Sequence, residues 1–102
     1  MRVPKQLSIA GHTIQVKYVK VLRYGGDDCW GLWDDDKHII YLKMGMDKTR
    51  EMEVLLHESM HAIEDIIDIE LGEEILDRLA REVLALIRNN KLNFLERRKP
   101  VK

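Results

Sequence analysis

Scarcity of cysteine is the first informative feature of this chain, whose 102 residues include one cysteine, Cys29. A single cysteine cannot form an internal disulfide, which is typical of a protein kept in a reducing compartment. No apolar run approaches the length of a membrane span, and residues 1–5 do not begin a signal peptide. These absences lead us to expect a cytoplasmic protein that does not bind a membrane.

An excess of charge of one sign is also lacking, since 17 Lys and Arg against 18 Asp and Glu give a net charge of −1. This balance offers no electrostatic reason to expect binding to nucleic acid. The length suits one domain with a modest core. We expect a single domain over residues 1–90, followed by a basic C-terminal tail over residues 91–102 whose default state is a solvated terminus.

The first half of the chain has the alternation of apolar and polar residues that predicts strands. Residues 7–22 are typical of a β-hairpin with Gly11 in its turn, and residues 29–33 and 38–42 predict a second strand pair. Residues 34–37 then form the turn between them. Their three aspartates lack the alternating oxygen ligands and central glycine of an EF-hand loop, so we interpret them as a solvated turn and not as a calcium site.

The second half has helical periodicity. Asp47 or Thr49 is suited to cap a first helix that runs to about Glu70, with Gly72 at the position just beyond its end. A second helix is expected over residues 73–90. The order of strands and helices predicts an α+β fold in which a small antiparallel sheet of about four strands precedes two long helices. The apolar arcs of the two helices are expected to pack, the first being Met52, Leu55, Leu56, Met60, Ala62, Ile63, Ile66 and Ile67, and the second Ile75, Leu76, Leu79, Ala80, Val83, Leu84, Leu86 and Ile87.

The first helix contains the sequence His57-Glu58-Ser59-Met60-His61, an HExxH motif. Two histidines four residues apart project from one helix face and can share one zinc ion, and the intervening glutamate can act as a base on a zinc-bound water. On a helical wheel His57 and His61 lie beside carboxylates and away from the most apolar sector. This placement favours metal ligation over the blander interpretation, an accidental motif on a solvated helix face.

A catalytic zinc usually has three protein ligands and one open position. A metzincin requires a glycine three residues after His61 and a histidine three residues beyond that. This chain has neither. Cys29 would complete a deformylase-like set, although a lone cysteine in a strand is more often a core residue. Glu64, Asp65 and Asp68 share a helix with His61 and are poorly placed to reach around the metal. Glu73 and Asp77 of the second helix remain, and their spacing alone does not decide between them.

The motif and the later segment Glu73-x-x-x-Asp77-Arg-Leu-Ala together resemble the gluzincin pattern. The nearest likeness is to ImmA/IrrE-type metallopeptidases, especially the short ones of phages and prophages. It takes in residues 2–5, the strand pair over residues 31–40, the motif, and the helix over residues 73–90. The resemblance implies that Glu73 is the third ligand and that Asp77 orients a metal-bound histidine, while the short connection from His61 leaves an exchange of these roles open.

The sequence therefore predicts a small intracellular zinc metallopeptidase, in which His57, His61 and Glu73 hold Zn²⁺ and Glu58 is the general base. The resemblance to zincins also implies that the strand over residues 38–43 lies at the sheet edge, where a peptide can add as a further strand. The expected partners are a peptide or protein substrate and, by the resemblance, a regulatory protein. Two alternatives remain: a non-catalytic zinc-stabilised module that binds a regulatory partner, and a metal-free helical interaction domain.

Overall fold

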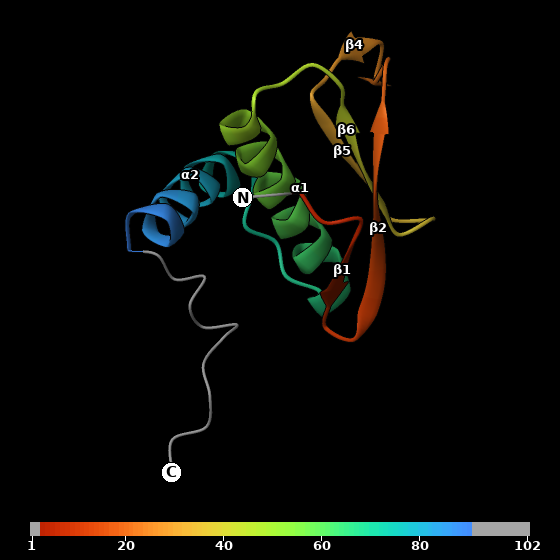
Figure 1. Cartoon of the computed structure of the whole chain (residues 1–102). Coiled ribbons are helices and arrows are strands. Elements are labelled where there is room, and N and C mark those ends of the chain that lie inside the picture. The colour runs from red at the N-terminus through yellow and green to blue at the C-terminus, as the bar shows by residue number, and fades with distance from the viewer. Residues whose placement is uncertain (1–2, 91–102) are drawn as a thin grey trace.

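The computed structural model describes residues 3–90, which form a sheet, a long helix and a second helix in that order across the molecule (Figure 1). The chain order is β1 (Gln6–Ile9), β2 (His12–Val19), β3 (Arg23–Tyr24), β4 (Asp27–Asp28), β5 (Gly31–Asp34), β6 (Ile39–Lys43), α1 (Lys48–Ile67) and α2 (Glu73–Asn90). The predicted α+β fold class is confirmed. The predicted tail over residues 91–102 lies outside the described residues.

Both predicted hairpins form. Strand β1 pairs antiparallel with β2, so that Leu7 faces Ile14, and β5 pairs antiparallel with β6, so that Trp33 faces Ile40. The two hairpins join through a parallel pairing of β2 with β6, which gives the strand order β1-β2-β6-β5. The sheet is thus mostly antiparallel, with one parallel pair at its centre.

This strand order corrects the expectation that the strand over residues 38–43 lies at the sheet edge. Strand β6 is central, because its two sides are taken by β2 and β5. The edge of the sheet next to the helices is β5, and the other edge is β1. The connector between the hairpins is also more ordered than expected, since β3 and β4 form a small ribbon whose turn residues, Gly25 and Gly26, both have the positive φ angles that a tight hairpin turn requires.

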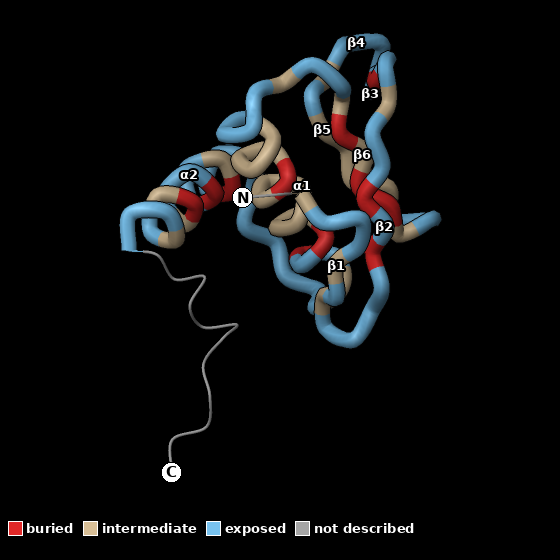
Figure 2. Tube along the Cα trace, in the orientation of Figure 1, coloured by how far each residue is buried: buried red, intermediate tan, exposed pale blue. Residues whose placement is uncertain are grey.

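The core lies between the sheet and α1, and buried residues run along both elements (Figure 2). Alternating side chains of the central strands point at the helix, and Leu55 of α1 fills the space between them. The cluster of buried residues consists of Ile14, Val16, Ile40, Leu42 and Leu55. Burying about five such side chains contributes on the order of 10 kcal/mol before the entropy of folding is subtracted. This packing fixes α1 against the sheet.

Helix α1 begins as predicted and ends earlier than predicted. Asp47 is its N-cap, with its side chain accepting the backbone N–H of Arg50 at 2.8 Å. The helix stops at Ile67 because Asp68 adopts the left-handed conformation, which short polar side chains tolerate, and the N–H of Ile69 turns back to the carbonyl of Glu64. Gly72 therefore does not end α1, and its carbonyl instead accepts the N–H of Leu76 at the start of α2.

Only part of each predicted apolar arc is buried. In α1, Leu55 and Ala62 are buried against the sheet, whereas Ile63 and Ile67 are exposed. In α2 the buried side chains are Leu76, Ala80 and Leu84, whereas Ile75, Leu79 and Leu86 are exposed. Two helices and one small sheet do not cover the full width of these arcs.

Among the helices of residues 3–90, none is long and apolar enough to span a membrane.

Candidate metal centre

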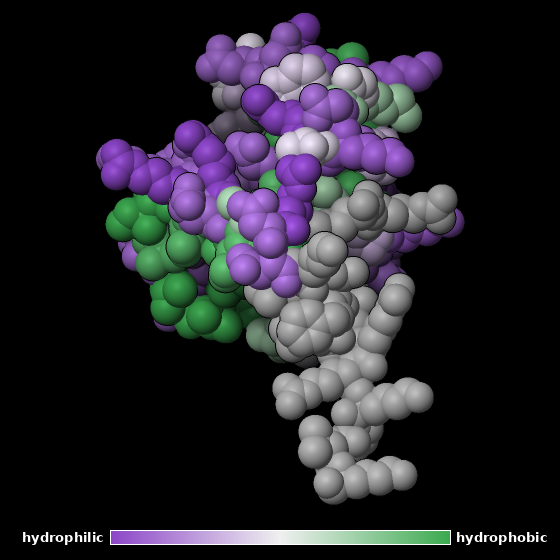
Figure 3. All heavy atoms as spheres, turned by 60° about the vertical axis from the view of Figure 1, so that its left-hand side comes forward, coloured by the Kyte–Doolittle hydropathy of each residue, from purple (hydrophilic) through white to green (hydrophobic). Residues whose placement is uncertain are grey.

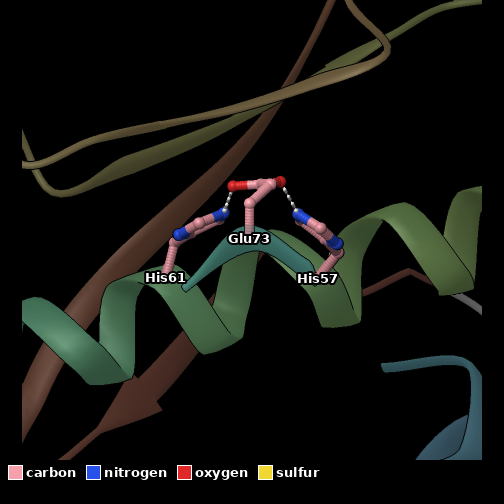
Figure 4. Close-up of side chains that lie close together, drawn as sticks. All are labelled: His57, His61 and Glu73. Carbon is pink, nitrogen blue, oxygen red and sulfur yellow. Dashed lines mark hydrogen bonds and ion pairs between the residues drawn. The ribbon is translucent and has the colours of Figure 1, made fainter. Parts of the chain in front are cut away.

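Helix α1 presents His57 and His61 side by side, and the first residue of α2, Glu73, lies between them (Figure 4). One oxygen of the Glu73 carboxylate is 2.7 Å from Nε2 of His57, and the other is 3.0 Å from Nε2 of His61. The two imidazoles come from successive turns of one helix, which is the geometry that a spacing of four residues dictates. The three side chains converge on one point from two helices.

The connection between the helices explains how Glu73 reaches both histidines. Residues 68–72 do not form a tight turn but run back along α1 before α2 begins (Figure 1). From Ile67 to the midpoint between His57 and His61 is about 12 Å along a helix axis. Five residues can span up to about 17 Å. The short link, once extended, therefore carries Glu73 to the level of both histidines.

The donor atoms of this cluster suit a zinc ion. Each of His57, His61 and Glu73 offers one ligand atom, and these atoms all lie within 4.8 Å of one another. Two imidazole nitrogens and one carboxylate oxygen are a donor set that catalytic zinc uses, and three protein ligands leave a fourth position for water or substrate. The chemistry and spacing of the side chains fit the group that the sequence predicts.

The outer nitrogen of each imidazole faces a carboxylate. Nδ1 of His61 is 3.1 Å from Glu64, and Nδ1 of His57 is 3.8 Å from Asp77. The first distance is a hydrogen bond and the second is too long for one. A carboxylate in this position fixes the tautomer of a metal-binding histidine, so that Nε2 carries the free lone pair. Asp77 also pairs with Arg81, and it lies on the far side of His57 from Glu73.

Glu64 has a second task in the connection between the helices. It is the buried charged residue of the described chain, and its carboxylate accepts the backbone N–H of Leu71 at 2.6 Å. This hydrogen bond is the main cause that lowers the pKa of Glu64, with smaller contributions from the backbone of Gly72 and from His61 against the cost of burial. An ionised Glu64 therefore ties the returning segment to α1 while it orients His61.

Glu58 lies beside the cluster on the side that faces β5. Burial between the helix and the strand raises the pKa of its carboxyl above the ordinary value. The histidines of the motif and the backbone N–H of Trp33 act in the opposite direction, and the negative charge of Glu73 adds to the rise. Glu58 is not one of the three converging side chains, but it lines the same cavity as His61 and Glu73.

A cavity of about 360 Å³ opens between β5, the β3–β4 ribbon and the helices. It gives access to His61 and Glu73 from the edge of the sheet. Residues of β5 and of both helices line it. The full lining is Tyr24, Cys29, Gly31, Leu32, Trp33, Glu58, His61, Asp65 and Glu73. Glu58 and Glu73 therefore face the same space, which a substrate can enter.

The other candidate metal ligands do not join the group formed by His57, His61 and Glu73. Cys29 lines the cavity but is not part of the converging group, and burial raises the pKa of its thiol, which opposes the thiolate that a metal requires. The aspartates of residues 34–36 are near one another, but Asp34 accepts the backbone N–H groups of Asp36 and Lys37. That pattern caps a turn, as predicted.

Two contributions of β5 were not expected from the sequence. Trp33 donates its indole N–H to Asp65 at 2.5 Å, which ties the strand to α1. Gly31 permits the close approach, because a Cβ there would lie 3.0 Å from Cγ of Glu58 and still closer to Val54. A lone glycine between bulky strand residues was the available signal, since it often marks such an approach.

Comparisons with protein-family models, with curated proteins and with solved structures each found no match. The resemblance to ImmA/IrrE-type metallopeptidases thus rests on the motifs of the chain itself.

Proposed function

We propose that this protein is a zinc-dependent peptidase that hydrolyses peptide bonds, with His57, His61 and Glu73 as the metal ligands. One observation carries the proposal: the ligand atoms of these residues lie within 4.8 Å of one another, and two of the residues, His61 and Glu73, line a cavity that Glu58 also lines. A purely structural zinc site is usually closed by four protein ligands and has no use for a base beside it. The open side of this cluster favours catalysis.

Zinc held there would supply a Lewis acid for the peptide carbonyl and make a water molecule acidic near neutral pH. The protein supplies the proton transfers. Glu58 accepts a proton from the attacking water and then passes it to the leaving amine. Glu64 orients His61 by accepting a hydrogen bond from its outer nitrogen, and Asp77 lies 3.8 Å from the outer nitrogen of His57.

The substrate that we propose is an extended peptide or a protein segment. Strand β5 is an edge strand of the described sheet and lines the cavity through Gly31, Leu32 and Trp33. Its outer backbone groups can pair with a peptide laid along the cavity as one more strand. By its motifs we propose kinship with the short ImmA/IrrE-type metallopeptidases of phages and prophages, a cytoplasmic location, and a regulatory protein as the natural partner.

The test compares wild type with Glu58→Gln, using Glu70→Gln as a matched control on an exposed carboxylate outside the ligand set. Both variants and the wild type should bind about one zinc, because Glu58 is not a ligand. Mass spectrometry of a degenerate peptide mixture should show cleavage by wild type and Glu70→Gln. Glu58→Gln should be slower by at least about 100-fold, the contribution of a positioned general base.

Three outcomes would contradict the proposal. Cleavage by Glu58→Gln at the wild-type rate would remove its assigned base. Zinc binding without cleavage of any peptide or protein by the wild type would favour the alternative, a zinc-stabilised module that binds a regulatory protein. Absence of zinc binding would favour a metal-free interaction domain.

A further inference from the structure

Helix α2 leaves a strip of large apolar side chains in contact with solvent. Ile75, Leu79 and Leu86 are 54%, 42% and 52% exposed. At about 100° per residue they fall within about 40° of one another around the helix, and about 120° from the centre of the buried arc. We call these three residues the α2 strip. Figure 3, which brings the α2 side of the molecule forward, shows hydrophobic side chains gathered in one area (Figure 3).

Other exposed apolar residues precede α2 in the chain. Ile63 and Ile67 on the last turns of α1 and Ile69 and Leu71 in the returning segment are exposed as well. Single exposed apolar residues are common on soluble proteins, whereas a contiguous group marks a contact surface. The exposed group belongs to the two helices and their link, and the metal ligands lie on a different side of α2, because Glu73 falls within the buried arc.

We propose that the α2 strip is the contact surface between two copies of this chain, paired antiparallel about a twofold axis. When the axis passes between residues 80 and 81, Ile75 of each copy faces Leu86 of the other. The two Leu79 side chains then lie on either side of the twofold axis, offset by about 4.5 Å along the helix direction at the helical rise per residue. A strip with apolar residues at both ends and in the middle is therefore complementary to itself, as a twofold interface requires.

The charges beside the strip decide between a second copy and an unrelated partner. Arg78 and Glu82 lie next to one another on its solvent side, one helical turn apart. In the antiparallel arrangement Arg78 of each copy lies opposite Glu82 of the other, which gives two equivalent ion pairs. A parallel arrangement would instead place Arg78 and Glu82 of the two copies on opposite sides of the seam, where these pairs cannot form. Opposite charges in this arrangement specify both the partner and its direction.

Both charged residues can take part in these pairs. Arg78 contacts Glu74 at 3.0 Å within its own helix, but both side chains are highly exposed, and such a pair contributes little. Glu82 has no ion pair with another residue in the described part of the chain. The pairs between the two copies therefore replace the weak ion pair of Arg78 with Glu74 and give Glu82 a partner.

The experiment is sedimentation equilibrium of the full chain over about 5 to 500 µM, a range suited to a small interface. The variants are Arg78→Glu, Glu82→Arg and the two together. Arg88→Glu is the matched control, with the same charge change on the same helix but about 160° from the strip. Circular dichroism checks that each variant keeps its helices.

We expect the wild type to dimerise and each single swap to raise the dimer Kd about tenfold, because it sets like charges opposite each other. The double swap should return the Kd to within about threefold of wild type, and Arg88→Glu should leave it unchanged. A monomer at every concentration would overturn the proposal and leave the strip to residues 91–102 or to another protein. A dimer whose Kd does not change on the charge swaps would also overturn it.

Discussion

At Gly31 the sheet approaches α1 so closely that a side chain has no room. A Cβ at this position would contact Val54 and Glu58, one a packing residue and the other the proposed base. The absence of a side chain at Gly31 therefore permits the close approach of the edge strand to α1 and to the proposed base.

We expect Gly31→Ala to destabilise the fold by about 1–3 kcal/mol, the usual cost of overpacking a close contact. Urea unfolding followed by circular dichroism measures the change. The double variant Gly31→Ala, Val54→Ala should recover part of the loss beyond the sum of the single effects, because it removes the methyl group that the new Cβ meets. Strict additivity of the two changes would show that the contact is not the cause.

Among the elements, the segment over residues 68–72 matters most for the site, because it carries Glu73 back along α1. Asp68 ends α1 early, and the Glu64 carboxylate holds the N–H of Leu71. Glu64 thus serves two elements at once, since its other contact is with His61. The link depends on a buried hydrogen bond and not on turn residues alone.

We expect Glu64→Ala to destabilise the protein by about 1–3 kcal/mol, because it leaves a backbone N–H without its acceptor and removes the partner of His61. It should also weaken zinc binding about 10-fold or more, as loss of a group that orients a metal ligand does. Urea unfolding and competition with a chelator measure the two effects. Glu70→Ala, on an exposed carboxylate of the same segment, should change stability by no more than about 0.5 kcal/mol. Equal effects of the two substitutions would rule out this role for Glu64.

For the molecule as a whole, local patterns predicted the elements and missed how they are assembled. Alternation and helical periodicity located both hairpins and both helices, because each depends on neighbours in the chain. The parallel pairing of β2 with β6 joins residues more than twenty positions apart, and nothing local to either strand specifies it. The resemblance to zincins implied that β6 lies at the edge, and in the structure β5 lies there. Likewise, periodicity gave the apolar arcs but not which part of each arc another element would cover.

The candidate site was predictable to the extent that a motif encodes it. The spacing of His57 and His61 on one helix fixes their side-by-side placement. The choice of Glu73 over Asp77 depended on the path of the link, which spacing alone did not reveal, and in the structure Glu73 meets both Nε2 atoms while Asp77 faces Nδ1 of His57. The contributions of Gly31 and Trp33 depend on contact between β5 and α1, which are distant in sequence.

The metal content of protein purified without added metal tests the central claim most directly, measured on wild type and on His57→Ala, Glu73→Ala and Asp77→Ala, each checked for its fold by circular dichroism. We expect about one zinc per chain in the wild type, loss of zinc in His57→Ala and Glu73→Ala, and retention of most of it in Asp77→Ala. Retention in Glu73→Ala with loss in Asp77→Ala would contradict the ligand assignment. No zinc in the wild type, even after reconstitution, would contradict the metal centre itself.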